Sequence, residues 1–145
     1  MRLWHKDLIP YLPRQQLLGQ WRECCCIARN IAKNNTPNHI LVNKIMDYPT
    51  EHFVIYSFYV ACVMINRGYK VKLGKFTQHM CVSPSVTFSK SFKAIDDVGL
   101  DIFPDWHNDR YFWQCYYNLQ EKYDCGGLTD EEWGIILDGV NQYGR

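Results

Sequence analysis

The sequence predicts an all-α fold, a compact single domain of residues 1–145 with three to four helices and long loops. Three observations indicate this class. Apolar residues recur at helical spacing near the N-terminus, an almost wholly apolar stretch of helix length follows, and two helix-start signals lie near the C-terminus. A chain of 145 residues has the usual length of one domain with one hydrophobic core.

The first expected element is an extended entry arm over residues 7–13, because Pro10 and Pro13 disfavour a regular helix there. A helix should begin near Pro13 or Arg14, since proline is tolerated in the first turn, and run to about Ala32. Its apolar residues recur with the period of a helix that packs one face on a core.

The polar face of this helix carries charged side chains at a regular spacing. Arg22 and Arg29 are two turns apart and nearly aligned, and Glu23 lies about 100° round the helix axis from Arg22. Two guanidinium groups therefore lie beside one carboxylate. The apolar face holds Leu17, Trp21, Cys24, Cys25, Ala28 and Ile31, and the polar face holds Gln15, Gly19, Arg22, Glu23, Cys26, Arg29 and Asn30.

The next expected element is a buried central helix from Phe53 to Ile65, since this stretch is apolar nearly all round. Thr50 is the expected N-cap, and Gly68 supplies a glycine stop. Thirteen residues are too few to cross a bilayer, so we expect this helix at the centre of the core.

Residues 69–95 form a loop-rich basic strip that contains no acidic residue. Two interpretations remain open. The strip is either an ordinary solvated surface segment or a nucleic-acid contact, in which cations bind phosphates and aromatic rings contact bases. Its cations and interleaved aromatic residues are Lys70, Lys72, Lys75, Lys90, Lys93, Phe76, Phe88 and Phe92.

Two further helices are expected near the C-terminus. One should run from Asn108 to about Lys122, before a pair of glycines. The other should follow Thr129, because Thr129 and Glu132 match a capping box. We expect the aromatic residues on these two helices to belong to the core rather than to a base-binding platform.

Charge is distributed unevenly along the chain, although the net charge is only +1. Residues 1–95 hold thirteen Lys/Arg and four Asp/Glu, a net charge of +9, whereas residues 96–145 hold three and eleven, a net charge of −8. This asymmetry fits a basic face that binds nucleic acid, or two halves that neutralise each other in the fold.

The seven cysteines include no pair spaced for zinc, and their odd number does not favour a disulfide framework. We expect reduced thiols that act as small apolar side chains. The sequence also lacks a signal peptide and an apolar run long enough to span a bilayer, so a cytoplasmic location is expected.

The first two residues have a specific chemical meaning. Met1 is followed by the large Arg2, beside which an initiator methionine is normally retained, so we expect a free α-amine at residue 1. As a class, α-amines have a reference pKa of about 7.7 to 8.0, against about 10.4 for lysine side chains. A larger fraction of an α-amine is therefore neutral and nucleophilic at neutral pH.

Residues 1–4, Met-Arg-Leu-Trp, and 15–23, Gln-Gln-Leu-Leu-Gly-Gln-Trp-Arg-Glu, together resemble the pyrimidine-dimer DNA glycosylases, the phage-type endonuclease V family. Residues 61–71, a buried run followed by Arg-Gly-Tyr, resemble the end of that family's second helix. The resemblance covers most of residues 1–75, and the order and spacing of the motifs carry it.

This resemblance implies a helical domain that flips a nucleotide out of damaged double-stranded DNA and cleaves its glycosidic bond. Met1 would supply the nucleophilic amine and Glu23 the catalytic carboxylate, while Arg2 and Arg22 would hold phosphates near the lesion. We expect Arg29 and the strip lysines Lys70, Lys72, Lys75, Lys90 and Lys93 to extend the DNA contact. The implied reaction uses no metal and no other cofactor.

The chain departs from the family pattern at several positions. The family's usual histidine after the first glutamine is Gln16 here, and its further arginine is Cys26. The nucleophile is often a threonine in the family, and the aromatic C-terminal tail is reduced to Tyr143-Gly144-Arg145. These differences bear on which lesion is recognised.

The predicted function is therefore a monomeric DNA repair glycosylase with abasic-site lyase activity, acting through an imine. The first alternative is a non-enzymatic nucleic-acid-binding helical module that uses the same basic face. The second is a helical protein-interaction domain that uses the acidic C-terminal half. Covalent trapping on damaged DNA distinguishes the enzyme from both, and steep salt dependence of binding distinguishes the two alternatives.

Overall fold

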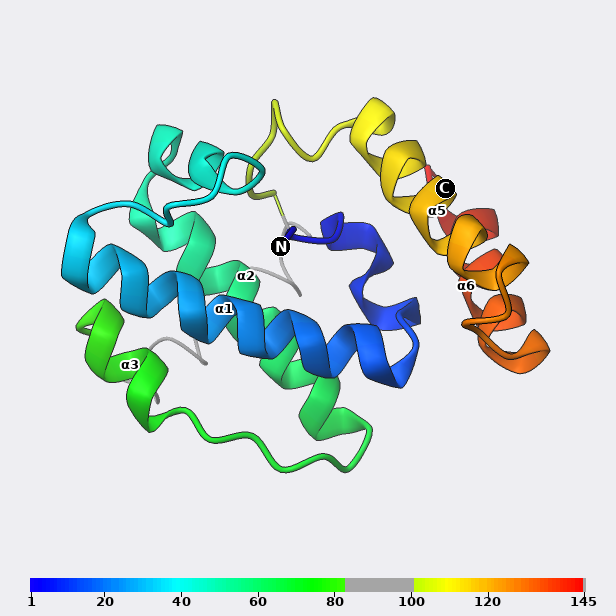
Figure 1. Cartoon of the computed structure of the whole chain (residues 1–145), viewed down its shortest axis with the longest axis horizontal. Coiled ribbons are helices and arrows are strands. Elements are labelled where there is room, and N and C mark those ends of the chain that lie inside the picture. The colour runs from blue at the N-terminus through cyan, green and yellow to red at the C-terminus, as the bar shows by residue number, and fades with distance from the viewer. Residues whose placement is uncertain (83–100, 145) are drawn as a thin grey trace.

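A computed structural model of the chain describes residues 1–82 and 101–144, and all regular structure in these residues is helical (Figure 1). The expected number of three to four helices is wrong, because the described residues alone contain five α-helices and two 3₁₀-helices. In chain order these are η1 (Lys6–Tyr11), α1 (Arg14–Asn34), η2 (Asn43–Asp47), α2 (Thr50–Asn66), α3 (Gly74–Met80), α5 (Asp109–Asp124) and α6 (Asp130–Gln142).

The two longest helices, α1 and α2, cross at the centre of the fold, and α3 packs against α1 (Figure 1). The central helix α2 buries nine of its seventeen residues, as its apolar sequence predicts. Thr50 is not the N-cap. Pro49 occupies that position with an extended backbone, φ −54° and ψ 140°, and Thr50 is the first helical residue.

Helix α1 ends at a left-handed residue. Asn35 has φ 58°, and its backbone N–H donates to the carbonyl of Ile31 at 2.9 Å. Asparagine tolerates this conformation better than most residues, so the helix runs two residues beyond the expected end at Ala32. The expected apolar face of α1 lies on the core, where Leu17, Trp21, Cys24 and Ala28 are buried.

The prediction of an extended arm over residues 7–13 is wrong, because η1 occupies most of this segment. His5 caps η1 through its Nδ1, which accepts from the backbone N–H of Asp7 at 3.1 Å. Pro10 lies inside this short helix. Its fixed φ suits a 3₁₀ turn, and its missing N–H removes only one hydrogen bond.

Helix α3 lies within residues 69–95, which the sequence predicted to be a loop-rich strip. Its ring residue Phe76 is fully buried and packs against Trp21 at 5.5 Å, Phe53 at 5.9 Å and Phe58 at 5.6 Å between ring centroids. Phe76 is thus a core residue and not a base-contacting one. A helix of seven residues is marginal alone, so tertiary packing stabilises it and the local sequence gives little signal.

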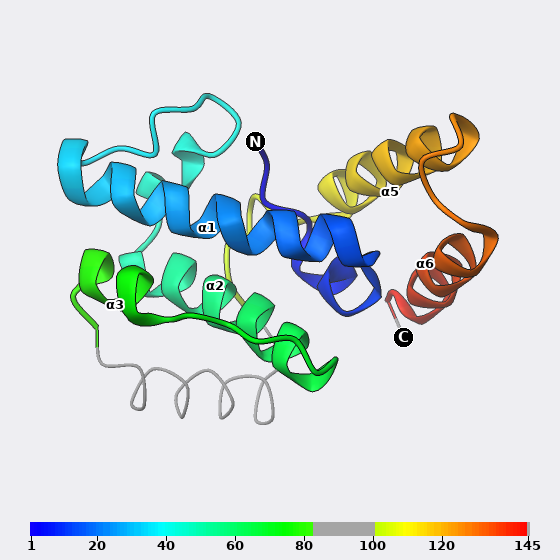
Figure 2. The same ribbon diagram turned by 60° about the horizontal axis from the view of Figure 1, so that its bottom comes forward.

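The hairpin of α5 and α6 follows its local capping signals. Asn108 is the N-cap of α5, and its side chain accepts from the backbone N–H of Tyr111 at 3.0 Å. The capping box of Thr129 and Glu132 is complete at the start of α6. Figure 2 shows both helices at one end of the molecule, with α3 toward the other.

Helix α6 contacts η1 closely. A Cβ at Gly139 would lie only 2.5 Å from the ring of Tyr11, so a larger side chain at this position would push the two elements apart. Among the helices of the described residues, none combines the length and the hydropathy that a membrane span requires. All seven cysteines are free; three of them are buried, and Cys81 and Cys125 are exposed.

Candidate active site

The N-terminal arm, residues 1–4, lies against α1 and is held there by the side chain of Gln20. The amide oxygen of Gln20 accepts from the backbone N–H of Trp4 at 2.7 Å, and its nitrogen donates to the carbonyl of Arg2 at 3.0 Å. Only 1% of Gln20 is exposed. A buried amide that satisfies two backbone groups fixes the position of the arm strongly, because leaving either group unpaired is costly.

Two tyrosines from other helices also hold the arm in place. The hydroxyl of Tyr56 on α2 donates to the carbonyl of Trp4 at 2.6 Å, and the hydroxyl of Tyr111 on α5 donates to the carbonyl of Leu3. Burial raises the pKa of both tyrosines above the ordinary value, so both hydroxyls stay protonated donors. Three helices thus converge on four residues of backbone.

Glu23 lies beside the first peptide bond of the chain. Its Oε2 accepts from the backbone N–H of Arg2 at 3.2 Å and lies 3.5 Å from the amide nitrogen of Gln20. Gln20 and Glu23 are one helical turn apart on α1, so they share a face. The α-nitrogen of Met1 is three covalent bonds from the Arg2 nitrogen, a separation of at most about 3.7 Å.

Met1 itself is 39% exposed. The structure therefore brings the predicted nucleophile and the predicted carboxylate into one neighbourhood. This juxtaposition places a nitrogen nucleophile one residue away from a backbone N–H that contacts a proton acceptor. Such a pair can attack an electrophilic carbon and then remove a proton from the adduct.

A cavity of 530 Å³ opens on the Glu23 side of the arm. Arg22 lines it from α1, and Lys122 lines it from α5. The two cations make this side of Glu23 suitable for a phosphate. The remaining lining residues include Trp4, Gln15, Gln16 and Gln20.

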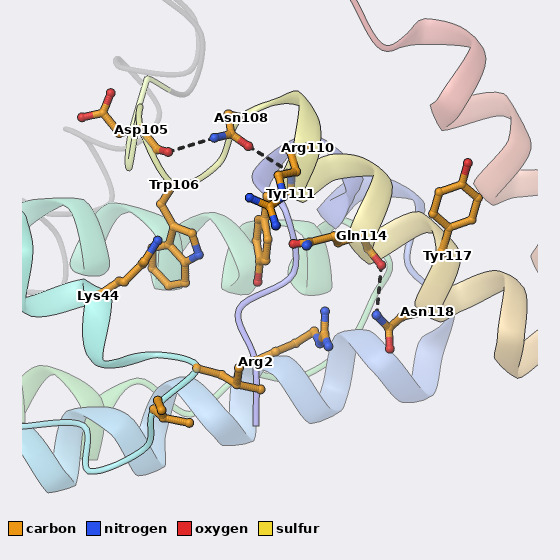
Figure 3. Close-up of a pocket in the computed structure, with 12 residues that line it drawn as sticks. Arg2, Lys44, Asp105, Trp106, Asn108, Arg110, Tyr111, Gln114, Tyr117 and Asn118 are labelled. Atoms are coloured by element: carbon orange, nitrogen blue, oxygen red, sulfur yellow. Dashed lines mark hydrogen bonds between the residues drawn. The ribbon is translucent and has the colours of Figure 1, made fainter.

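A larger cavity of 680 Å³ opens on the Arg2 side. Figure 3 shows Arg2 facing Gln114 and Arg110 of α5 across it, with Lys44 and Trp106 toward one end. The wall combines flat aromatic rings with amide side chains, which can stack on and hydrogen-bond to a planar polar group. The other labelled residues of this wall are Asp105, Asn108, Tyr111, Tyr117 and Asn118.

The other predicted DNA-binding residues are distributed more widely. Arg29 and Lys75 line a third cavity, of 390 Å³, between α1 and α3, together with Lys33 and His79. The structure thus brings Arg29 and Lys75 together, which their sequence positions did not reveal. Lys70 and Lys72 are exposed between α2 and α3. Lys90 and Lys93, like Phe88 and Phe92, lie outside the described residues.

Two buried histidines anchor the residues that follow the arm. The rings of His5 and His107 are stacked with centroids 5.2 Å apart, and the backbone N–H of Lys6 donates to His107 Nδ1 at 3.0 Å. Burial lowers the pKa of both histidines, and the charge of His5 lowers that of His107 further. Both rings are therefore neutral at neutral pH, and neither Nε2 has a hydrogen-bond partner among the described residues.

The sequence profile of the pyrimidine dimer DNA glycosylase family matches residues 1–77, more than half of the chain. The chain belongs to this family. Its membership implies the function of a pyrimidine dimer DNA glycosylase, with DNA as the substrate. Searches of curated proteins and of solved structures returned no match.

The matched segment contains the whole arm, residues 1–4, together with Gln20, Glu23 and Tyr56. Tyr111 lies beyond the match. Sequence reasoning missed Gln20, Tyr56 and Tyr111 as supports of the arm. A polar Gln20 one turn before Glu23 was an available signal, whereas nothing in the local sequence indicates that a tyrosine will reach residues 3 and 4.

Two departures from the family pattern can now be located in the structure. Gln16 lines the cavity that holds Glu23, and its buried Oε1 has no hydrogen-bond partner among the described residues. Cys26 lines the cavity of Arg29 and Lys75. In the described part of the chain, no three His, Cys, Asp or Glu side chains gather as metal ligands would.

Proposed function

We propose that this protein is a DNA glycosylase with an associated abasic-site lyase activity, in which the α-amine of Met1 is the nucleophile and Glu23 is the catalytic carboxylate. The observation that carries the proposal is the hydrogen bond from the backbone of Arg2 to Glu23 Oε2 at 3.2 Å. It sets a carboxylate beside the first residue. Family membership supplies the substrate class.

In the first step, the neutral amine attacks C1′ of the damaged nucleotide. The bond between C1′ and the base nitrogen breaks, and the base leaves with that electron pair and takes up a proton. Positive charge develops on the sugar as the bond breaks, and the nearby carboxylate of Glu23 stabilises it. The bond between C1′ and the ring oxygen then breaks. The ring oxygen keeps that electron pair and takes up the proton that the amine loses, and the nitrogen lone pair completes an iminium with C1′.

In the second step, the iminium makes the proton on C2′ more acidic. Glu23 accepts this proton, and the electron pair released forms a double bond between C2′ and C3′. The bond between C3′ and its oxygen breaks, so the 3′ phosphate leaves and the strand is cut by β-elimination. Water then hydrolyses the imine and regenerates the amine.

Cationic side chains in the cavities on both sides of the arm bind the DNA phosphates. Arg22 and Lys122 share a cavity with Glu23, and Arg2 lines the opposite cavity. Arg29 and Lys75 extend the positive surface farther along α1. We assign double-stranded DNA as the substrate and a monomer as the acting form, with Lys70, Lys72, Lys90 and Lys93 as further contacts.

Reductive trapping tests the nucleophile directly. Borohydride added during reaction with duplex DNA that holds an abasic site or a pyrimidine dimer should reduce the imine to a stable protein–DNA adduct. Peptide mapping should place the link on Met1. The variants Lys44→Arg and Lys122→Arg each remove a cavity-lining lysine amine but keep its charge. Both should give as much trapped adduct as wild type.

The matched control is the same chain with an acetylated N-terminus, since an amide nitrogen is neither basic nor nucleophilic. It should show no adduct and no strand cleavage. Equal trapping of the acetylated chain would remove Met1 from the mechanism. Absence of any adduct from the free chain, with retained salt-dependent DNA binding, would instead favour the non-enzymatic binding module.

A further inference from the structure

The connection between α1 and α2 exposes two consecutive large aliphatic side chains. Ile40 is 83% exposed, the largest fraction for any large hydrophobic residue in the described part of the chain, and Leu41 is 52% exposed. Single exposed hydrophobic residues are common on protein surfaces, but two neighbours projecting from one turn are a candidate for contact with an apolar partner.

This turn is braced rather than loose. The backbone N–H of His39 donates to Asn43 Oδ1 at 3.0 Å, and the backbone N–H of Leu41 donates to His39 Nδ1 at 3.2 Å. Val42 is fully buried directly after the exposed pair, so it anchors the turn in the core. Ile40 and Leu41 are therefore held outward before any partner arrives, which lowers the entropy lost on binding.

The exposed pair lies at the cavity on the Arg2 side of the N-terminal arm. Ile40 and Leu41 line this cavity together with Arg2, which follows the proposed nucleophile directly in the chain. Lys44 and Arg110 line it as well, against the single acid Asp105 (Figure 3). Aliphatic tips flanked by an excess of cations match duplex DNA, where phosphates surround an apolar stack of bases.

On the basis of the proposed function, we propose that Ile40 and Leu41 form a wedge that enters the DNA base stack beside the lesion. An aliphatic wedge separates two neighbouring base pairs and occupies the space that a displaced nucleotide leaves. This lowers the cost of opening the duplex so that Met1 and Glu23 can reach the lesion. The two residues are positioning residues, because they act on the DNA stack and not on the reacting atoms.

The test uses the double variant Ile40→Ala/Leu41→Ala in the full chain, with two substrates. On duplex DNA with a dimer or abasic site, we expect cleavage to slow at least tenfold under single-turnover conditions. On single-stranded DNA with an abasic site, no stack must be opened, so cleavage should stay within twofold. The control Ile65→Ala removes a side chain that is 48% exposed and does not line the cavity, and it should leave both rates unchanged.

A second readout needs no catalysis. Binding to a duplex with a tetrahydrofuran abasic analogue next to 2-aminopurine should raise the 2-aminopurine fluorescence through unstacking, and the double variant should lose this rise. The single conservative variant Ile40→Leu, which keeps the wild-type Leu41, should show the same fluorescence rise as wild type. An unchanged rise in the double variant, no rise with wild type, or equal loss of cleavage on both substrates would overturn the wedge. Should wild type cleave nothing, the proposed function fails while the fluorescence still decides the wedge.

Discussion

The backbone N–H of Arg2 and the Oε2 of Glu23 form a hydrogen bond of 3.2 Å, although the two residues are 21 positions apart. Gln20 contacts both residues of this pair, since its amide nitrogen donates to the Arg2 carbonyl and lies near Glu23 Oε2. One turn of α1 therefore helps to position the N-terminus, together with Tyr56 of α2 and Tyr111 of α5. A rigid helix positions reacting groups more accurately than a loop does.

The first prediction concerns Glu23. Glu23→Gln keeps the side-chain shape and an oxygen that can accept from Arg2, but it removes the negative charge and the proton acceptor. Strand cleavage should fall by two or more orders of magnitude, because a positioned acid–base group typically contributes this much. Single-turnover cleavage of abasic and dimer-containing duplexes measures the effect. Fluorescence anisotropy should show DNA affinity within a few-fold of wild type, and cleavage at nearly the wild-type rate would exclude Glu23 from the mechanism.

The second prediction separates positioning from chemistry. Gln20→Met keeps the side-chain length but leaves the Trp4 N–H and the Arg2 carbonyl without their partner, so the arm should loosen. We expect cleavage to fall by about ten- to a hundredfold, since a displacement of about 1 Å can cost that much. Hydrogen exchange at the amide of Trp4 should accelerate in parallel. Gln142→Met, at an exposed position at the end of α6 that lines none of the three cavities described above, is the control and should change neither quantity.

Local signals in the sequence predicted part of this site. The 3.6-residue period placed Arg22 and Glu23 on the polar face of α1, and both line one cavity. The caps at Asn108 and Thr129 predicted where α5 and α6 begin, because a capping residue bonds within its own turn. These features depend on residues within a few positions of each other.

The features that the sequence did not predict depend on distant partners. Tyr111 reaches Leu3 across 108 positions, and no periodicity reports such a contact. Helix α3 is stabilised by Phe76, which packs against Trp21 of α1 and Phe53 of α2. The basic, serine-rich sequence around Phe76 does not predict this packing. The helical form of η1 was missed because Pro10 suggested extended backbone, although a 3₁₀ turn accepts its φ equally well.

The third prediction addresses DNA binding. Affinity for undamaged duplex should fall steeply with salt, with a log–log slope of roughly −3 to −6 if about four to six cations contact phosphates. Arg22→Ala should flatten this slope by about one unit, since Arg22 lines the cavity that holds Glu23. Arg14→Ala removes an exposed cation near Tyr69 at the start of the same helix and should leave the slope unchanged. A salt-independent affinity would mean that the basic half contacts protein instead.

The fourth prediction follows from the buried histidine pair. Burial lowers the pKa of His5 and His107 in the folded protein below the value of about 6.5 expected when unfolded. The unfolded chain then binds more protons as the pH falls, although Asp7 partly offsets the effect on His5 and Lys6 adds to it at both rings. Stability is therefore fully present above about pH 6.5 and declines below it, toward the lowered folded pKa values.

The decline should reach at most about 1.4 kcal/mol per pH unit for each histidine. Urea unfolding of wild type between pH 7.5 and pH 4.5 measures it. His107→Phe keeps an aromatic ring on His5 but removes one titrating group and the acceptor for the Lys6 N–H, so it should be less stable at pH 7.5 and lose stability less steeply on acidification. Phe76→Leu destabilises the core at α3 without touching the pair, so it should keep the wild-type steepness. If the stability of His107→Phe falls as steeply with decreasing pH as that of wild type, the buried ring of His107 is not a source of the pH dependence. The attachment of the N-terminal arm then does not depend on the protonation of His107.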